Sequence, residues 1–388
     1  MSRGHETANL RIMMIYGWQL NPYIEYVVQA LLNRGADVTL VTQKALDVNI
    51  QHPGCSVHPL FPVTASTRLL HLLHLLLAEC VALWRLAGLI RRLKPHIVHV
   101  VALRVPYLDW LLFLYLKWQR IKVVFTVHDT RSHNFAVDDV IVARVARHCD
   151  ALFVHTRYSK QFIQQTWRID PAKIFVVPHG GYESHVTRLP QDEVRSQLGY
   201  DKSDYILLFF GSIKPYKGLD FLIEAMRDVK PLVPEIKLII AGKPSSSGLD
   251  THYRGLIAES KLEGAITYEN RYIQDDEAAQ FFSACDIVVL PYLHIDQSGV
   301  LCLAYTYGKP VIVTQVGGLT EMVQEGTTGY GVPPGNTAAL AAKISEAWTD
   351  KPHLQKMGDH AHQLLKVDYS WDRLAAMTLD VYRTLLAS

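Results

Sequence analysis

The chain has 388 residues, of which 49% are hydrophobic and 20% are charged, as is typical of a globular protein with a large core. This length exceeds one ordinary core and predicts two domains. The lack of long charged or low-complexity runs excludes a disordered chain. Five scattered cysteines without a C-x-x-C pair indicate neither a disulfide framework nor a zinc site. The polar start, Met1–Asn9, does not resemble a secretory signal, so we expect a cytoplasmic protein.

The net charge is only +2, but the charges are distributed unevenly. Residues 1–186 contain 20 Lys and Arg against 12 Asp and Glu, a balance of +8, which leaves 19 against 25, a balance of −6, for residues 187–388. The basic half favours an anionic partner, such as lipid head groups or a phosphorylated acceptor. Nucleic acid is not expected, because no aromatic–basic motif is present. Ordinary solvated surface charge is the alternative.

In chain order, apolar strand-like segments alternate with helical patterns. Leu10–Tyr16 is predicted as a strand, and Tyr23–Asn33 as a helix. The further strands predicted in the first half are Asp37–Thr42, His96–Val101, Lys122–Val127, Ala151–His155 and Ile174–Val177. Those of the second half are Tyr205–Phe210, Lys237–Ala241, Ile266–Tyr268, Asp286–Leu290 and Val311–Val313. This βαβ alternation predicts two parallel, doubly wound sheets, with the polar stretch Arg188–Ser203 as the linker.

Two apolar segments raise the question of a membrane. Leu69–Ile90 is 22 residues long but contains two histidines, a glutamate and an arginine. Spanning helices have few or no charges, so we interpret it as a buried helix with a polar edge. Tyr107–Trp118 is too short to span and is interpreted as core packing. The alternative is peripheral docking on the inner face of the cell membrane, helped by Arg91, Arg92 and Lys94.

A first candidate anion-binding loop, Gly211–Gly218, follows the predicted strand Tyr205–Phe210. It opens a helix with apolar residues at i, i+3, i+4 and i+7. Lys214 and Lys217 lie near the start of this helix, where unpaired N–H groups and the positive end of the dipole favour a phosphate. The loop is not a Walker A motif, and taken alone it is indistinguishable from surface lysines beside a turn.

A second candidate loop, Gln297–Val300, follows the strand Asp286–Leu290. Ser298 and Gly299 begin a helix, and after the next strand a Gly317-Gly318 pair opens a helix that carries Glu321. Glycines let a ligand approach backbone N–H groups closely. In an open α/β sheet such loops lie at the carboxyl ends of the strands, where ligands bind. The two loops together predict a diphosphate, and therefore a nucleotide-type ligand.

Six short motifs carry a resemblance to a known family. They are V-P-H-G-G at 177–181, G-S-I-K-P-Y-K-G-L-D at 211–220, S-A-C-D-I-V-V-L-P-Y at 283–292, Q-S-G-V at 297–300, G-K-P-V-I-V at 308–313 and V-G-G-L-T-E-M-V at 316–323. In this order they resemble the retaining glycosyltransferases of family 4. The resemblance covers nearly the whole chain and is most specific over residues 205–335. It implies the GT-B fold, in which two Rossmann-like domains face each other across a cleft that holds the active site.

The resemblance also implies domain boundaries and roles for individual residues. Residues 1–187 plus 372–388 would form the acceptor side, and residues 188–371 the donor side. Lys217 matches the lysine that neutralises the donor diphosphate, and His128 matches a histidine near the transferred sugar, with Asp129 contacting acceptor or donor. The remaining donor-binding residues implied are Gly17, Gly211, Ser212, Lys214, Asp296, Ser298, Gly299, Val300 and Glu321.

The implied reaction is retaining transfer of a sugar from a nucleotide-diphosphate sugar to a glycan or a lipid-linked acceptor, with formation of an α-linkage. No cofactor and no metal are expected. Developing charge on the leaving diphosphate would be stabilised by lysines and helix amides. In this family the leaving phosphate is often held to deprotonate the acceptor, and spacing alone assigns no carboxylate as a nucleophile.

The sequence departs from the family pattern at several positions. The family often has a Glu-x7-Glu pair beside the second loop, but here the aligned residues are Ile295 and Leu303, with Asp296 as the candidate to replace the first acid. Ser212 stands where an arginine is usual, and Lys214 can supply that charge. The loop Gly17–Pro22 lacks the common glycine pair. These departures leave the donor and its ribose recognition open.

Alternatives to the transferase prediction stay open at this point. One is a nucleotide-sugar epimerase of the same fold, although we identify no carboxylate set for it. The other is a non-catalytic nucleotide-binding protein. At the residue level, His179 in Pro-His-Gly-Gly is better explained by a turn than by chemistry. Asp296 and Glu321 also have an alternative interpretation, because a solvated acid in a loop or at the start of a helix would give the same sequence pattern.

Overall fold

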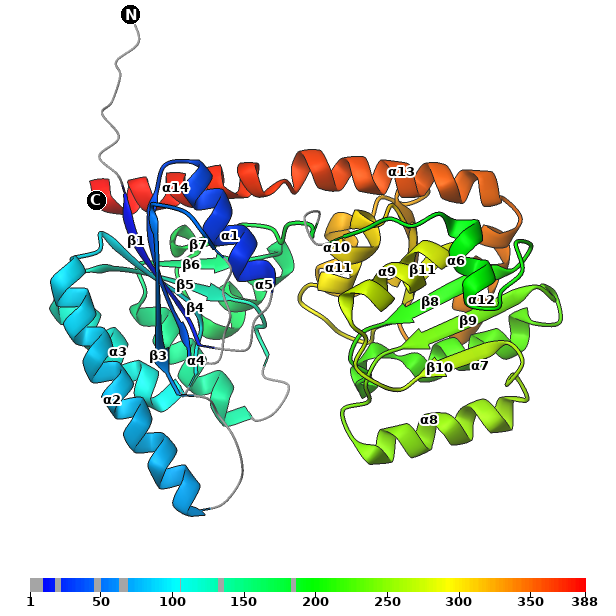
Figure 1. Cartoon of the computed structure of the whole chain (residues 1–388), viewed down its shortest axis with the longest axis horizontal. Coiled ribbons are helices and arrows are strands. Elements are labelled where there is room, and N and C mark those ends of the chain that lie inside the picture. The colour runs from blue at the N-terminus through cyan, green and yellow to red at the C-terminus, as the bar shows by residue number, and fades with distance from the viewer. Residues whose placement is uncertain are drawn as a thin grey trace, which may run out of the picture. The chain divides into compact units, whose positions relative to one another are not determined.

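The structure, a computed structural model, describes residues 10–17, 22–44, 50–62, 69–104, 106–131, 136–182 and 186–388. The chain divides into two compact units (Figure 1). Unit 1 comprises Met1–Pro178 and Trp371–Ser388, and unit 2 comprises His179–Ser370.

Unit 1 is built on a seven-stranded parallel sheet with the strand order β3-β2-β1-β4-β5-β6-β7. Its strands are β1 (Arg11–Tyr16), β2 (Asp37–Gln43), β3 (Cys55–Phe61), β4 (Ile97–Ala102), β5 (Lys122–Val127), β6 (Ala151–Val154) and β7 (Ile174–Val176). Its α-helices are α1 (Pro22–Asn33), α2 (Leu69–Leu93), α3 (Pro106–Trp118), α4 (Ala136–His148), α5 (Arg157–Phe162) and α14 (Trp371–Ala387). A π-helical turn, Ile163–Trp167, and a 3-10 turn, Pro171–Lys173, follow α5.

Alternation along β1 explains the layers of unit 1. Met13 and Ile15 belong to a core cluster shared with α2, α3 and α4, whereas Ile12 and Met14 belong to a cluster shared with α1 and α14. Successive side chains of a strand point to opposite faces of the sheet. An apolar strand therefore needs helices on both faces, and the C-terminal helix α14 supplies part of the second cover.

Unit 2 is built on a six-stranded parallel sheet with the order β10-β9-β8-β11-β12-β13. Its strands are β8 (Tyr205–Phe210), β9 (Ile236–Ala241), β10 (Ile266–Glu269), β11 (Ile287–Leu290), β12 (Val311–Thr314) and β13 (Gly329–Val332). Its α-helices are α6 (Gln191–Gln197), α7 (Leu219–Val229), α8 (Ser247–Ser260), α9 (Asp275–Ala284), α10 (Gly299–Thr306), α11 (Leu319–Met322), α12 (Thr337–Trp348) and α13 (Lys351–Asp368). A 3-10 turn, Pro215–Lys217, precedes α7.

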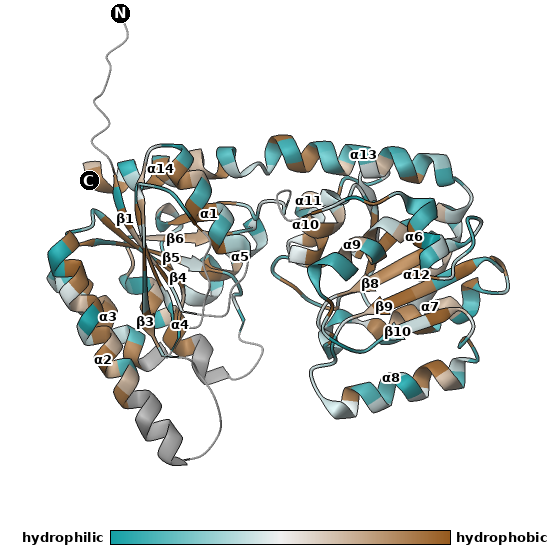
Figure 2. Cartoon of the chain, in the orientation of Figure 1, coloured by the Kyte–Doolittle hydropathy of each residue, from teal (hydrophilic) through white to brown (hydrophobic). Residues whose placement is uncertain are grey.

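The strands of unit 2 are hydrophobic along their length, as Figure 2 shows for β8 and β9. Leu207 and Phe209 of β8 pack in a cluster with α7, α8 and α12, and Ile206 and Leu208 pack in a second cluster with α9, α10 and α13. Both units are thus parallel sheets with helices on two faces, which confirms the predicted doubly wound α/β class.

The strand orders locate the place in each unit where a ligand can bind. In unit 1 the chain runs from β1 outwards to β3 and then returns to the other side of β1 as β4. In unit 2 it runs from β8 outwards to β10 and returns beside β8 as β11. Helices leave the sheet in opposite directions at these switch points, so a crevice opens at the carboxyl ends of the strands.

Several predicted elements differ from the structure. The strands β3 and β13 were not predicted, because Pro59 interrupts the first and two glycines weaken the pattern of the second. The predicted linker, Arg188–Ser203, is wrong, since it contains α6 and is tied into unit 2. Arg195 is 3% exposed, and its Nη2 donates to Asp286 Oδ2 at 2.8 Å.

The division of the chain also falls at other residues than those predicted. The predicted boundaries follow residues 187 and 371, and the observed ones follow Pro178 and Ser370. Residues just after Pro178 hydrogen-bond within unit 2, where the Tyr182 N–H donates to Thr306 Oγ1 at 3.1 Å. Arg188 donates to the Thr306 carbonyl oxygen from Nε at 3.2 Å.

The interpretation of α2 as a buried helix with a polar edge is wrong in one respect. Its inner face is buried as predicted, at Leu86 and Ile90. Its outer face, however, exposes Leu77, Val81 and Trp84. The neighbouring α3 likewise combines a buried face with exposed apolar residues. No described helix has both the length and the apolar character needed to cross a membrane.

Candidate functional site

The loop after β8 places Lys217 in a buried position at the switch point of unit 2. Lys217 ends the 3-10 turn and is 8% exposed, and its Nζ lies 5.6 Å from the centroid of the Tyr292 ring. Burial, together with the positive charge of Lys214, lowers the pKa of Lys217 to about 8. A buried ammonium without a full counter-charge is costly, so this position suits a bound anion.

The two predicted anion-binding loops meet in space. Gly211 has φ +93°, and a Cβ at this residue would lie 3.2 Å from Lys217 Nζ and 3.4 Å from Val300 Cγ2. The Leu293 N–H donates to the Tyr216 carbonyl oxygen at 2.7 Å, which ties the loop after β11 to the loop after β8. Gly211, Lys217 and the start of α10 therefore line one small region.

Gly218 is required by the same convergence. Its φ is +67°, and a Cβ there would lie 2.0 Å from the Pro291 carbonyl oxygen, directly after β11. Only glycine accepts both this backbone conformation and this contact. The glycines at the two ends of the first loop thus permit its close packing on the second.

The start of α10 presents backbone N–H groups at this region. Ser298 is the N-cap, and its hydroxyl oxygen accepts a hydrogen bond from the Leu301 N–H at 3.3 Å. The first N–H groups of a helix have no acceptor within the helix, so those of Gly299 and Val300 remain to bind a ligand. The dipole of the helix adds partial positive charge at the same point.

The other predicted donor-side residues have more varied settings. Asp296 is 8% exposed, in the loop before α10, and Gly317 packs against the same loop, because a Cβ at Gly317 would overlap the Ile295 carbonyl oxygen. Lys214 is half-buried beside the Tyr216 ring, whereas Ser212 and Glu321 are exposed. The structure thus gathers Gly211, Lys217 and Val300 most closely.

Gln297 was not predicted as a site residue but has an informative side chain. Its Oε1 atom is buried and accepts no hydrogen bond from any described residue. Buried polar atoms nearly always have partners, so this oxygen is suited to a donor that a ligand or water brings. Its place in the Gln-Ser-Gly-Val turn was the signal that could have identified it.

In unit 1, Gly17 follows β1 and is held by a buried arginine. Arg104 Nη1 donates to the Gly17 carbonyl oxygen, and Arg104 Nε donates to Glu79 Oε1 at 2.9 Å. The side chains of Arg104 and Glu79 are 4% and 3% exposed. Neither was predicted, although a glutamate and an arginine within apolar stretches were visible in the sequence. The rest of the predicted loop, residues 18–21, lies outside the described residues.

His128 and Asp129 follow β5 directly, as predicted. His128 is half-buried and Asp129 is exposed. The ring of His128 lies 5.1 Å from the ring of Tyr23, edge to face, and its Nδ1 lies 3.1 Å from Nε2 of His155. His155 was not predicted as a site residue. His179 Nδ1 lies 2.7 Å from the Gly180 carbonyl oxygen, in agreement with a turn.

A metal site is not apparent in the part of the chain that the structure describes. Across those residues no group of three or more His, Cys, Asp or Glu side chains could hold a metal ion. The cationic groups that the structure gathers in unit 2 are instead Lys217, Lys214 and the start of α10.

Two family models match the chain. One is described as glycosyl transferases group 1 and matches residues 190–364, and the other is described as a glycosyl transferase 4-like domain and matches residues 20–180. Among curated proteins, the lipopolysaccharide 1,2-N-acetylglucosaminetransferase of Salmonella typhimurium is 28% identical over 232 residues, which are 58% of this chain and 59% of that protein. The match thus spans less than two thirds of the relative's length.

Solved structures resemble the chain over nearly its full length. Sucrose-phosphate synthase from Thermosynechococcus elongatus has a TM-score of 0.77 at 21% identity and covers 97% of this chain and 99% of its own. HepE of Anabaena in complex with UDP has a TM-score of 0.74 at 15% identity and covers 96% of this chain and 100% of its own. At these identities the likeness shows the fold, and it confirms the predicted GT-B architecture of two Rossmann-like domains.

Proposed function

The chain belongs to the glycosyl transferases group 1 family, and we propose that it transfers a sugar from a nucleotide-diphosphate sugar to a glycan or lipid-linked acceptor. In this proposal the reaction retains the anomeric configuration and forms an α-glycosidic bond. The observation that carries it is the convergence of Gly211, Lys217 and the start of α10 in unit 2. Unit 2 then binds the donor, and unit 1 binds the acceptor.

The proposed catalysis acts mainly on the leaving group. Cleavage of the bond between the sugar and the β-phosphate leaves negative charge on the diphosphate. The Lys217 ammonium and the N–H groups of Gly299 and Val300 would stabilise this charge, and such groups act strongly where water is excluded. Because these groups already supply positive charge, we propose that the reaction requires no metal ion.

Retention in this proposal depends on the departing phosphate. The acceptor hydroxyl forms its bond to the anomeric carbon on the face from which the diphosphate leaves. A phosphate oxygen accepts the hydroxyl proton as the sugar–phosphate bond breaks.

The donor base can be tested first by binding. HepE was solved with UDP, so UDP is the first nucleotide to examine, and GDP, ADP and dTDP are compared with it. A ligand that binds only the native state raises its apparent stability. We expect one of these nucleotides to raise Tm, and the corresponding nucleotide sugar to be consumed with an α-linked product, read from the anomeric NMR signals.

Lys217→Met provides the matched test of the site. Loss of a group that stabilises the leaving charge lowers kcat by about 10²–10³-fold, whereas Lys230→Met, at the far end of α7, is the control and should retain activity. Ligand-free Lys217→Met should be at least as stable as the wild type, because a buried charge is removed. Absence of binding to any nucleotide, a β-linked product, or epimerisation without transfer would each contradict the proposal.

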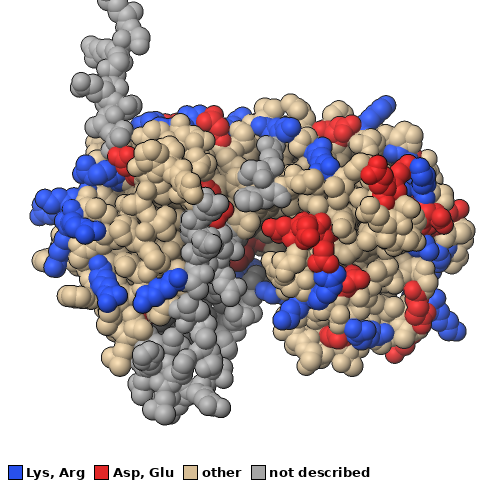
Figure 3. All heavy atoms as spheres, in the orientation of Figure 1, with Lys and Arg blue, Asp and Glu red and all other residues tan. Residues whose placement is uncertain are grey.

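We also propose that unit 1 docks on the inner face of the cell membrane, which favours a lipid-linked acceptor and a role in polysaccharide biosynthesis. The exposed apolar residues of α2 and α3 include Trp84, at 77% exposure, and Trp118, at 72%. Figure 3 shows Lys and Arg side chains gathered around the C-terminal end of α2 on the face in view. Aromatic and basic residues together suit an anionic bilayer surface.

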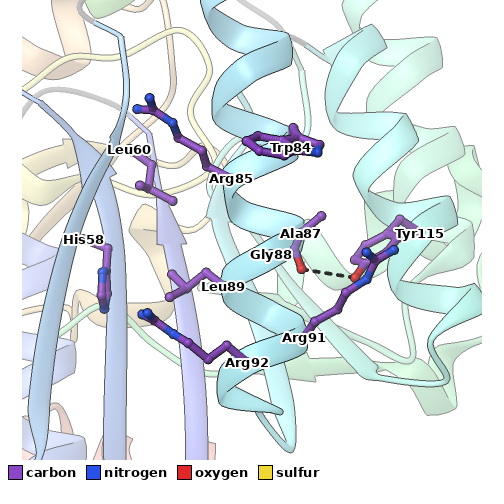
Figure 4. A pocket seen from close by; sticks show the side chains of 10 residues that line it. All are labelled: His58, Leu60, Trp84, Arg85, Ala87, Gly88, Leu89, Arg91, Arg92 and Tyr115. Carbon is purple, nitrogen blue, oxygen red and sulfur yellow. Dashed lines mark hydrogen bonds between the residues drawn. The ribbon is translucent and has the colours of Figure 1, made fainter.

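A groove between β3, α2 and α3 adds to this surface (Figure 4). His58 and Leu60 line it from β3, and Arg85 and Arg92 extend towards that side. On the α3 side, the Arg91 guanidinium lies 5.6 Å from the Tyr115 ring centroid. Among the described residues, no acid forms an ion pair with Arg85, Arg91 or Arg92, so their charge is available to lipid phosphates.

Vesicle sedimentation tests the docking proposal. The protein should bind vesicles that contain phosphatidylglycerol, bind neutral phosphatidylcholine vesicles weakly, and dissociate as salt rises. Trp84→Ala combined with Trp118→Ala should reduce binding, whereas Tyr272→Ala, at a residue of unit 2 that is 67% exposed, should not. Equal binding to neutral and anionic vesicles, or none to either, would contradict docking.

A further inference from the structure

His128 and His155 occupy equivalent places on neighbouring strands. The parallel register of β5 and β6 pairs Val127 with Val154, and each histidine is the next residue along its strand. The two rings therefore lie side by side at the carboxyl edge of the unit 1 sheet, with centroids 4.9 Å apart. Tyr23 packs edge-on against both of them.

The hydrogen bonds of His155 determine where its proton lies. Its Nδ1 is 2.9 Å from the carbonyl oxygen of Val177, and a carbonyl oxygen can only accept. Nδ1 of His155 therefore carries the proton and donates. Burial lowers the pKa of His155 to about 4, so the ring is neutral at physiological pH, and its Nε2 is then an unprotonated acceptor.

The state of His128 follows from that of His155. Nε2 of His155 lies 3.1 Å from Nδ1 of His128. Because Nε2 of His155 is an acceptor, Nδ1 of His128 must carry the proton in this hydrogen bond. When His128 is neutral, its Nε2 then has no proton and can accept a hydrogen bond.

We propose that His155 is a positioning residue that fixes the ring and the Nδ1–H tautomer of His128, which we predict to lie near the transferred sugar. The part of His128 in turnover rests on the proposed function, whereas its tautomer rests on the geometry of unit 1 alone. The arrangement matches the general rule that the partner of one ring nitrogen sets the state of the other.

Nitrogen-15 NMR of histidine-labelled protein tests the tautomer directly, since it distinguishes protonated from unprotonated ring nitrogens. At neutral or mildly alkaline pH, we expect wild-type His128 to show a protonated Nδ1 and an unprotonated Nε2. His155→Leu removes both hydrogen bonds and should shift His128 towards the Nε2–H tautomer. His155→Gln keeps an acceptor for His128 and a donor for the Val177 carbonyl, and should restore the wild-type pattern.

His99→Leu is the control for a purely structural effect. His99 is 2% exposed and bonds to Tyr382 and Thr126 rather than to His128. The His99→Leu substitution should lower the stability of the protein and leave the His128 tautomer unchanged. In turnover, we expect His155→Leu to lower kcat by about 10–100-fold, as for other residues that orient a functional side chain, with a smaller change in donor KM and recovery in His155→Gln.

Two results would overturn the proposal. One is an Nε2–H tautomer of His128 in the wild type, and the other is the same tautomer in wild type and His155→Leu. Failure of the proposed function would look different, because no nucleotide sugar would be consumed while the tautomer pattern still followed His155.

Discussion

Lys217 combines burial with a formal charge, and this combination sets a pH dependence. Its pKa is about 8 in the ligand-free protein, and a bound diphosphate would raise it. Between these two values the protein must take up a proton to bind the nucleotide. Affinity should therefore be nearly constant below pH 8, as far as this group is concerned, and then weaken by up to tenfold per pH unit.

Calorimetric titration of the nucleoside diphosphate from pH 7.5 to 9.5 measures this dependence. Lys217→Arg is the matched variant, because a guanidinium stays protonated over the whole range, and its affinity should be nearly independent of pH. A wild-type affinity that is equally flat would show that Lys217 does not meet the phosphate. In the ligand-free protein the buried ammonium opposes folding, and this penalty fades as pH rises from about 8 towards 10.5, because the unfolded chain then binds more protons than the folded one.

Gly211 allows a second prediction, because the effect of a side chain beside Lys217 can be separated from the effect of strain in a left-handed backbone. Gly211→Ala places a Cβ 3.2 Å from Lys217 Nζ. The control is Gly199→Ala, because Gly199 has φ +79° and a Cβ built there has no neighbour within 4 Å. Both substitutions strain a left-handed residue and should cost about 1–2 kcal/mol of stability. Gly211→Ala alone should also weaken nucleotide binding, measured by titration. Equal affinities in the two variants would contradict a role for Gly211 beside the phosphate.

At the scale of elements, strands buried on both faces were predictable and edge elements were not. β1, β5 and β8 are continuous apolar runs, which indicate their type without any tertiary information. Periodicity finds the apolar faces of a helix such as α2 but cannot tell which of them another element will cover. Here one face packs on the sheet and the other stays exposed.

The candidate site could be proposed from the sequence where its residues are contiguous. The loop of Gly211 and Lys217 is a single motif, and so is the turn that starts α10. The pair of His128 and His155 is separated by 27 residues in the chain, and only the register of β5 and β6 brings the two rings together. Arg104 and Glu79 are likewise joined only by folding.

The N-terminus of α10 can be tested as an element through its cap. Ser298→Ala removes the hydroxyl that accepts from the Leu301 N–H, which should cost about 1 kcal/mol of stability and loosen the first turn. Asp350→Ala removes the cap of α13, whose carboxylate accepts from the His353 N–H at 3.1 Å. That helix follows another helix rather than a strand. Both variants should lose stability, but only Ser298→Ala should bind the nucleotide more weakly, and the reverse result would exclude α10 as the phosphate site.

At the scale of the whole molecule, the chain holds two sets of cores. The described core clusters each draw their residues from one unit, and α14 returns the C-terminus to unit 1. Proteins with several domains often unfold in more than one step. The basic and acidic halves of the sequence coincide closely with the two units, and our proposals place lipid binding in unit 1 and nucleotide binding in unit 2.

Two buried tyrosines make this separation testable. Tyr382 on α14 and Tyr253 on α8 are both fully buried, and their hydroxyls lie beside His99 and Asp220. Truncation of either to alanine should cost about 3–5 kcal/mol, as for other large buried aromatic residues. Hydrogen exchange should show Tyr382→Ala exposing amides of unit 1 and Tyr253→Ala exposing amides of unit 2.

A saturating nucleoside diphosphate should then protect unit 2 in the wild type and in Tyr382→Ala, because its proposed phosphate contacts all lie in that unit. Two results would show that our proposal places the donor in the wrong unit. One is protection confined to unit 1, and the other is loss of nucleotide binding in Tyr382→Ala but not in Tyr253→Ala.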